Sequence, residues 1–472
     1  MPTPQLRVAI VGAGPAGIYA ADILTKTDLD VAVDLFERLP APYGLVRYGV
    51  APDHPRIKGI VNALYKVLQR GDIRLIGNVD IGTDLSLDEL GEYYDAVIFS
   101  TGAIQDADLN IPGVDRDGSY GAADFVSWFD GHPDVPRTWP LRAEQIAVIG
   151  NGNVALDVAR ILAKHVEDLM TTEIPQNVAD GLAASPVTDV HIFGRRGPAQ
   201  SKFTPLELRE LGKVPDVDVV VYPEDFDFDT GSEEAIRSSN QTKQVVKTLT
   251  DWSLRDPAEL RASRRIHLHF LHRPVEILGS DQVTGLRTER TELTGDGSVR
   301  GTGRFEDFDV QAVYRAVGYF GSPIPQVPFD PVAGVIPNDA GRVLDSHGEH
   351  IPGWYATGWI KRGPVGLIGH TKSDAGETIR HLVEDVTAAL GQGTLPSATR
   401  RDPEAILERL SAAGIPYTSW RGWELLDAHE RALGESAGRA RIKVVPREDM
   451  TEISRNGALA EAVAEQVAYQ RG

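Results

Sequence analysis

Short apolar runs alternate with amphipathic stretches along the first hundred residues. The runs Arg7–Val11 and Val31–Glu37 predict strands, and Ile18–Lys26 between them predicts a helix. Farther along, Ile57–Gln69 carries its apolar residues on one helical face, and Ala96–Thr101 predicts a buried strand. Strands and helices in alternation are typical of a parallel sheet with crossover helices.

The same pattern returns near Gln145. Ile146–Ile149 predicts a strand, Val154–Leu169 a helix and Asp189–Phe193 the next strand. Later strands, with a hairpin among them, are predicted at Ile266–Leu278, Gly285–Leu293 and Val310–Val317. The duplication predicts an α/β protein with two Rossmann-like dinucleotide-binding domains.

The last third of the chain contains less regular patterns. Trp354–Thr357 predicts a short strand, and a helix is expected from about Gly366 to Leu390. The tail from Arg400 is mostly helical by composition, with two tryptophans in a predicted loop at Ala412–Glu424. Because the motifs described next precede this tail, we expect a chain ending before Arg400 to keep the chemistry.

A glycine-rich turn follows the first strand and opens the first helix. Its spacing is that of a dinucleotide-binding fingerprint, which brings the backbone close to a pyrophosphate. Glu37, at the end of the next strand, can accept hydrogen bonds from ribose hydroxyls and would repel a 2′-phosphate. The alternative is a chance glycine-rich turn. The fingerprint predicts FAD or NAD rather than NADP, with the candidate residues Gly12, Ala13, Gly14, Pro15, Ala16, Gly17, Glu37 and Arg38.

A second glycine-rich turn follows the strand near Gln145. The strand after it ends in Gly194-Arg195-Arg196, where an NAD site would have an acidic residue. Two guanidinium groups suit a dianionic 2′-phosphate, so this turn predicts NADP. The alternative is a solvated arginine pair. The candidate residues in the turn are Gly150, Asn151, Gly152, Asn153 and Val154.

One site that disfavours NADP and one that selects it suggest hydride transfer from NADPH to a flavin. The segment Trp359–Ile368 precedes a predicted helix, whose N-terminus could stabilise the negative charge of a reduced flavin. An ordinary junction between a loop and a helix is the alternative for this segment.

The composition limits the remaining function classes. The chain has 472 residues and a formal net charge of −20, which disfavours nonspecific binding to nucleic acid or anionic membranes. It has no cysteine, so disulfides, cysteine-held iron–sulfur clusters and a redox dithiol are excluded within this chain. We expect no metal site, no membrane span and a cytoplasmic location.

The segment Pro42–Pro55, with the sequence PYGLVRYGVAPDHP, is similar to the adrenodoxin reductase-type family of ferredoxin–NADP reductases. Gly150–Arg160, Gly194–Glu210 and Gly358–Gly369 resemble the same family. The likeness covers Val8 to about Gly391 and is greatest to bacterial members with a C-terminal extension.

The resemblance implies an NADP domain at residues 104–317, inserted into an FAD domain formed by residues 1–103 and 318–399, with an extension at 400–472. It implies FAD contacts at Ala13, Ala16, Glu37, Leu45, Val79, Trp359, Gly366, Leu367 and Ile368. It implies NADP contacts at Asn151, Gly152, Asn153, Val154, Arg195, Arg196, Glu207 and Gly366. His54 and Glu210 match a pair near the nicotinamide and the flavin. From the residues alone, His54 could cap a helix and Glu210 could be a solvated helix residue.

The resemblance also implies an acidic ferredoxin as the electron acceptor. Basic residues in an otherwise acidic chain could steer it: Arg255, Arg261, Arg264 and Arg265. The alternative for this region is a charged helix followed by a strand with exposed histidines. Two alternatives remain for the function: an NADPH oxidase or quinone reductase, and a flavin-binding scaffold with slow turnover.

Overall fold

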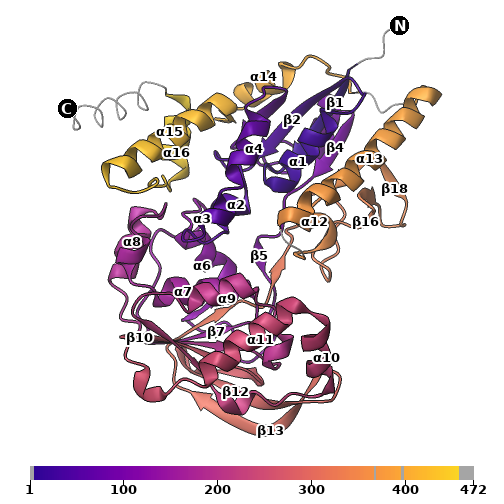
Figure 1. Cartoon of the computed structure of the whole chain (residues 1–472). Coiled ribbons are helices and arrows are strands. Elements are labelled where there is room, and N and C mark those ends of the chain that lie inside the picture. Colours follow the sequence, from indigo (N-terminus) through magenta and orange to yellow (C-terminus); the bar gives the residue numbers. More distant parts are fainter. Residues whose placement is uncertain (1–4, 366–367, 395–397, 457–472) are drawn as a thin grey trace. The chain divides into compact units, whose positions relative to one another are not determined.

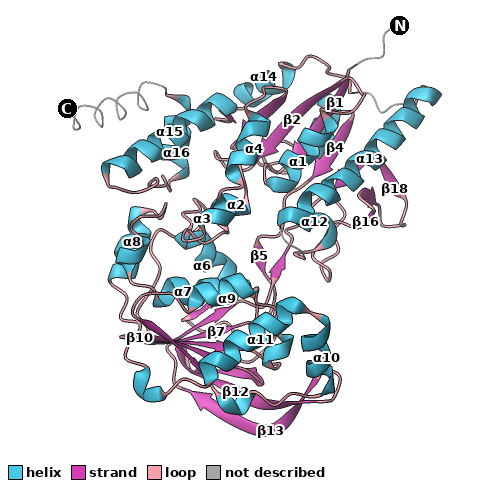
Figure 2. Ribbon diagram, in the orientation of Figure 1, coloured by secondary structure: helices cyan, strands magenta, loops and turns pink. Residues whose placement is uncertain are grey.

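The computed structural model describes residues 5–365, 368–394 and 398–456, and the chain divides into two compact units. Unit 1 comprises Met1–Gln105, Asp130–Asp134 and Tyr319–Gly472, and unit 2 comprises Asp106–Phe129 and Val135–Gly318. Figures 1 and 2 label many of the elements of each unit. Two short strands lie where the chain passes between the units: β5 (Gln105–Asp106) and β15 (Tyr319–Phe320).

Unit 1 is built on one sheet with the strand order β16-β17-β18-β4-β1-β2-β3-β19. Its five central strands are parallel: β1 (Leu6–Val11), β2 (Val31–Glu37), β3 (Ile73–Gly77), β4 (Ala96–Phe99) and β18 (His350–Ala356). Antiparallel strands complete both edges: β16 (Asn338–Asp339), β17 (Arg342–Leu344) and β19 (Thr418–Ser419).

Alternate residues of β1 face opposite layers. Val8 and Ile10 pack with α1 (Pro15–Leu24), α4 (Val61–Leu68), α13 (Ile368–Gln392), α15 (Trp420–Ser436) and α16 (Arg447–Arg455). Ala9 and Val11 pack with α5 (Leu87–Tyr93) and α14 (Ala405–Ala412). Helices α1 and α13 lie side by side (Figure 1). The helices after residue 400 therefore contribute to the core on both faces of the sheet.

Unit 2 has a fully parallel sheet with the order β6-β14-β7-β8-β10-β9. The strands are β6 (Ser119–Gly121), β7 (Gln145–Ile149), β8 (Asp189–Phe193), β9 (Val217–Val221), β10 (Arg264–His269) and β14 (Ala312–Arg315). Its helices are α6 (Ala122–Phe129), α7 (Asn153–Ala163), α8 (Gln176–Ala183), α9 (Pro205–Leu211), α10 (Thr230–Ser238) and α11 (Asn240–Ser253).

An antiparallel sheet packs against unit 2's parallel sheet through a shared apolar cluster. It consists of β11 (His272–Gly279), β12 (Val283–Leu293) and β13 (Val299–Phe308). Because β13 is mostly exposed and polar, the apolar pattern of the sequence does not reveal it. The predicted strand Ile266–Leu278 is wrong as one element, because a turn at Leu271, with φ of 56°, separates β10 from β11.

Three helix predictions also need correction. The predicted helix Ile57–Gln69 is interrupted: α3 (Pro55–Lys58) ends before α4 begins at Val61. The predicted helix Val154–Leu169 ends at Ala163, because Lys164 is extended, and a short 3₁₀ turn follows. The two tryptophans expected in a loop lie in the first turn of α15. None of the described helices has both the length and the apolar character needed to cross a membrane.

Candidate functional site

The first glycine-rich turn lies at the carboxyl end of β1, between the neighbouring strands β2 and β4. The N–H of Gly12 donates to the carbonyl of Phe36 at 2.8 Å. Gly12 has φ of +108°, and a Cβ there would lie 2.6 Å from the carbonyl oxygen of Ser100. A Cβ on Gly17 would collide with the carbonyl of Gly12. The first and third glycines are therefore required by the turn and by the packing of α1 on β1.

The start of α1 fits a pyrophosphate. Gly14 is its N-cap and provides no side-chain cap, and its first turn contains no acidic residue. The amides of Ala16 and Gly17 are among those that a helix leaves without carbonyl partners at its N-terminus. Among the described residues, a Cβ on Gly14 would approach only the Cα of Gly44, at 3.9 Å. Unused amides, the helix dipole and open backbone together favour a bound phosphate group.

Glu37 lies beside this turn. Its two carboxylate oxygens accept the N–H of Ala13 at 2.9 Å and the N–H of Leu39 at 3.1 Å. Burial raises the pKa of Glu37, and these two N–H groups oppose the rise. Each oxygen keeps a lone pair for a ribose hydroxyl. Arg38 is directed to a different partner, since its guanidinium donates to Asp134 at 2.7 Å.

The other predicted flavin residues come from several segments of unit 1. Val79 is buried after β3, and its N–H donates to the carbonyl of Glu37 at 3.0 Å. Leu45 begins α2 (Leu45–Tyr48), and Trp359 begins α12 (Trp359–Arg362). A Cβ on Gly358 would lie 2.6 Å from the Cβ of Ala16, so the start of α12 lies against α1.

Of the predicted residues near α13, Gly366 and Leu367 lie outside the described residues, and Ile368 begins the helix. The proposed action of this helix N-terminus on a flavin therefore stays a prediction.

The second glycine-rich turn lies at the carboxyl end of β7, next to the end of β8. Ile149 is in register with Phe193, and the N–H of Gly150 donates to the carbonyl of Phe193 at 3.1 Å. A Cβ on Gly150 would collide with the carbonyl of Ala316. Gly152 is the N-cap of α7 and provides no side-chain cap, so the first amides of α7, including that of Val154, are available to an anion.

Arg195 and Arg196 are exposed in the loop that follows β8. No described residue forms a hydrogen bond or ion pair with either guanidinium, although the backbone of the loop is fixed. Thr291 donates to the carbonyl of Arg195 at 2.8 Å, and the N–H of Leu271 donates to that of Arg196 at 3.1 Å. A Cβ on Gly194 would lie 2.9 Å from Cγ of Asn151, so this loop touches the second turn. Two available cations thus lie beside a helix start whose amides suit an anion.

Three further predicted residues lie in a short helix or at the start of one. Glu207 is buried and Glu210 half-buried in α9 of unit 2, and α9 is tied to the second turn because Oδ1 of Asn153 accepts the N–H of Thr204 at 2.9 Å. His54 is buried at the N-cap of α3 in unit 1, but its side chain makes no cap hydrogen bond. The capping alternative is therefore wrong, and a pairing of His54 with Glu210 stays a prediction.

Comparison with known proteins agrees with this geometry. The profile of the pyridine nucleotide-disulphide oxidoreductase family matches residues 6–192. NADPH-ferredoxin reductase FprA of Mycobacterium tuberculosis is 42% identical over 94% of this chain and 98% of its own. Human mitochondrial NADPH:adrenodoxin oxidoreductase is 39% identical over 96% of this chain and 92% of its own. A solved structure of M. tuberculosis FprA in complex with NADPH has a TM-score of 0.88 and 39% identity, covering 96% of this chain and all of that one.

The chain belongs to the adrenodoxin reductase-type family of ferredoxin–NADP reductases. Its fold, with two Rossmann-like domains of which one is inserted in the other, is the predicted one. Unlike a disulphide reductase, this family member has no cysteine and cannot form a redox dithiol in its own chain.

The basic region of this reductase lies in unit 2. Arg255, Arg261 and Arg265 are exposed. Arg264 is half-buried, and its guanidinium donates to the carbonyls of Ala163 at 3.3 Å and Lys164 at 2.9 Å. The alternative of exposed histidines is wrong, because the histidines that follow are buried or half-buried: His267, His269 and His272.

Three of the reductase's histidines stack on one face of unit 2's sheet. The rings of His191 and His267 lie 4.3 Å apart and nearly parallel, and Nδ1 of His191 lies 3.0 Å from Nε2 of His269. Ligand nitrogens of all three lie within 4.8 Å of one another. However, stacked rings keep their lone pairs in parallel planes that do not meet at one ion. Asp189 and Tyr222 also occupy the two nitrogens of His267, at 2.9 and 2.8 Å, so we assign the cluster to packing.

Acid should destabilise the protein through this cluster. Burial lowers the pKa of His191 to about 3 and that of His269 to about 2, from 6.5. Below pH 6.5 the unfolded chain binds protons that the native cluster excludes, so stability falls as the pH drops. The slope is at most about 1.4 kcal/mol per pH unit for each histidine. Urea unfolding between pH 7 and 5 should show a shallower slope for His269→Phe, whereas the exposed control His347→Gln should match the parent. Equal slopes in all three would contradict the assignment.

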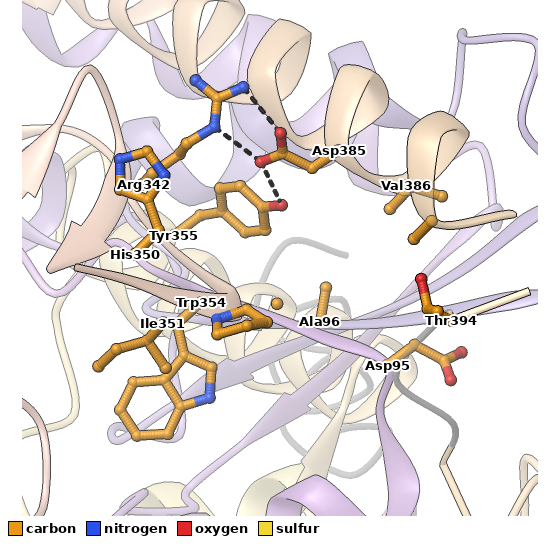
Figure 3. A pocket seen from close by; sticks show the side chains of 13 residues that line it. Asp95, Ala96, Arg342, His350, Ile351, Trp354, Tyr355, Asp385, Val386 and Thr394 are labelled. Carbon is orange, nitrogen blue, oxygen red and sulfur yellow. Dashed lines mark hydrogen bonds and ion pairs between the residues drawn. The ribbon is translucent and has the colours of Figure 1, made fainter. Parts of the chain in front are cut away.

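A cavity of about 430 Å³ lies at the opposite edge of unit 1's sheet from the first turn, by the amino ends of β4 and β18 (Figure 3). Three of its polar side chains bond to one another. Arg342 forms two hydrogen bonds of 2.8 Å with Asp385, which also accepts the hydroxyl of Tyr355 at 3.0 Å. Because the first glycine-rich turn lies at the carboxyl end of β1, the cavity at the amino ends of β4 and β18 is not part of that turn.

Proposed function

We propose that the protein is an FAD-dependent NADPH–ferredoxin reductase. The observation that carries the proposal is the presence of two unlike dinucleotide turns in one chain. Glu37 beside the first turn suits ribose hydroxyls, whereas Arg195 and Arg196 beside the second suit a 2′-phosphate. FAD, when bound, accepts a hydride from NADPH and gives electrons singly to an iron–sulfur acceptor. The NADPH named for the FprA complex and the ferredoxin named for the relatives support this assignment.

In this proposal, residues 1–103 and 318–399 bind FAD and residues 104–317 bind NADP. The amides at the start of α1 and the carboxylate of Glu37 hold the FAD pyrophosphate and ribose, and Leu45, Val79 and Trp359 contribute the surrounding contacts. The amides at the start of α7 hold NADP, with Glu207 nearby. His54 and Glu210 orient the nicotinamide. The cytoplasm is the proposed location, on the composition alone.

The test is the visible spectrum of the purified protein during anaerobic titration. We expect a yellow protein containing FAD, whose absorbance near the flavin maximum is bleached by NADPH at much lower concentration than by NADH. A colourless protein that takes up no FAD would contradict the proposal. Bleaching far slower than turnover of known reductases would favour a scaffold. Reduction of quinone or oxygen with no salt-sensitive reduction of ferredoxin would favour the oxidase alternative.

Charge reversal in the basic region should weaken ferredoxin binding. We expect Arg255→Glu, Arg261→Glu and Arg265→Glu together to raise the KM for an acidic ferredoxin at low salt, with little effect on a neutral dye. Arg264 is left unchanged because it holds two carbonyl groups of unit 2. At about 0.2–1 kcal/mol for each exposed pair, the increase should be roughly three- to a hundredfold.

The control for this experiment reverses three exposed arginines elsewhere in unit 2: Arg237, Arg300 and Arg304. Both triple variants change the net charge equally, so a long-range effect of charge would raise both KM values alike. That result would place the docking surface elsewhere.

A further inference from the structure

A short segment lies directly on the first dinucleotide turn. The N–H of Tyr43 donates to the carbonyl of Ala13 at 2.8 Å. Gly44 has φ of +50°, and a Cβ there would lie 3.1 Å from the Cα of Gly14. This segment, Tyr43–Tyr48, continues into α2, a helix of four residues whose N-cap provides no side-chain hydrogen bond. A single turn is too short to be stable by itself, so other contacts must fix its position.

Several of these contacts come from the C-terminal part of the chain, the described residues after 400. Arg47 of α2 is buried, and its two terminal nitrogens donate to the two carboxylate oxygens of Glu430, at 3.0 and 2.5 Å. Glu430 is fully buried in α15. The guanidinium also lies over the rings of Tyr48 and Trp423, at 5.1 and 5.2 Å. A bidentate pair between buried groups fixes orientation as well as distance.

Glu430 is itself held in place. The N–H of Val444 donates to one oxygen at 3.0 Å, and Arg441 donates to the other at 3.1 Å. Lys443 lies between Arg441 and Val444 in the chain. Its Nζ donates to the backbone carbonyl of Arg47 at 2.7 Å and to that of Asp130 at 2.9 Å. The C-terminal part therefore binds Arg47 at two points: Glu430 bonds to its side chain, and Lys443 bonds to its backbone carbonyl.

A contribution to stability does not by itself explain why a buried ion pair stands here. A buried ion pair loses hydration on both partners, and apolar residues of similar volume often stabilise a protein equally well. A pair of this kind does specify one geometry. Here the geometry is that of the segment whose backbone touches Gly14, in the turn that the proposed function assigns to FAD.

We propose that Glu430 and Lys443 are positioning residues of the FAD site, which hold the Tyr43–Tyr48 segment on the first dinucleotide turn. The C-terminal part then contributes to FAD affinity without touching the cofactor. This inference rests on the proposed function, because it requires FAD at the first turn.

The experiment measures FAD affinity and the flavin absorption spectrum for Glu430→Gln and Lys443→Met, together with urea unfolding of each protein. Glu430→Gln removes the charge and keeps the shape, and Lys443→Met leaves Asp130 paired with Lys58 at 3.3 Å. The matched control is Asp95→Asn, because Asp95 is a buried carboxylate of unit 1 that also pairs with the C-terminal part, through Arg401 at 2.7 Å. Asp95 lies at the amino edge of the sheet, away from the turn.

We expect FAD affinity to fall at least tenfold in Glu430→Gln and at least threefold in Lys443→Met, with an altered flavin band. Asp95→Asn should keep the FAD affinity of the parent, even if its free energy of unfolding falls as much as that of the two test variants. Unchanged affinity in both test variants would overturn the inference, and so would an equal loss in the control. If Glu430→Gln does not fold, Lys443→Met decides. A parent protein without FAD would instead refute the proposed function.

Discussion

Replacing Arg195 and Arg196 together with alanine is expected to abolish most of the preference for NADPH over NADH. The two coenzymes differ only in the 2′-phosphate, which two guanidiniums can meet with charge-assisted hydrogen bonds of roughly 1.5–3 kcal/mol each. Both arginines are exposed in a loop whose backbone is fixed, so they can meet the phosphate without breaking another contact. Two such bonds correspond to a preference in kcat/KM on the order of a hundred- to ten-thousandfold in the parent.

The measurement is steady-state dye reduction with each coenzyme. In the double variant, the KM for NADPH should rise while kcat and the values for NADH hardly change, because the 2′-phosphate is remote from the transferred hydride. Arg300→Ala with Arg304→Ala removes two exposed charges of the same unit and should behave as the parent does. If the double variant keeps the full preference, the phosphate binds elsewhere. Lys202 is then the next candidate, since it is exposed and its N–H donates to the carbonyl of Asn151 at 2.9 Å.

Ending the chain at Thr399 is expected to prevent unit 1 from folding. This reverses the expectation from the sequence, in which the tail was dispensable. The truncation would remove six buried apolar side chains from both faces of the sheet: Ile406, Leu410, Trp423, Leu426, Met450 and Ile453. At roughly 1.5–3 kcal/mol each, their loss is comparable with a total stability of about 5–15 kcal/mol. Arg47 would also lose the buried partner of its charge.

The truncated protein should be insoluble, or lack the cooperative unfolding of the full chain by circular dichroism. Single substitutions in the full chain should lower the free energy of unfolding without preventing the protein from folding. Leu426→Ala and Met450→Ala should each cost about 2–5 kcal/mol in urea unfolding, whereas Arg421→Ala, exposed on the same helix as Leu426, should cost little. A soluble truncation that binds FAD as the parent does would restore the original expectation.

The sequence predicts well those features that depend on neighbours along the chain. Each glycine-rich turn, its strand and its helix lie within about twenty residues, so spacing alone located Gly12 and Gly150 and the residues beside them. Strands such as β1 and β4 are buried on both faces, and their apolar runs are easy to recognise. Glu37 and the arginine pair follow from the ends of such strands.

Features that depend on distant residues were not predictable in this way. Nothing near Arg47 indicates that it pairs with Glu430, 383 positions later. Several helix ends were predicted wrongly, although the sequence contains a capping signal for the start of α15. Ser419 caps α15 by accepting the N–H of Gly422 at 3.1 Å, so the tryptophans after it begin a helix and do not lie in a loop.

The order of the strands in unit 1 has a consequence for the newly made chain. Strand β18, which pairs with β4, and helix α13, which packs on α1, are encoded after all of unit 2. At about 5–20 residues per second, the ribosome needs on the order of tens of seconds to extend the chain from β4 to β18. During that time β4 presents an unpaired edge, while the residues of unit 2 are already available to fold. We therefore expect unit 2 to fold first. The first part of unit 1, up to Gln105, stays incompletely folded until β18 and α13 are made, and is the part that chaperones must protect.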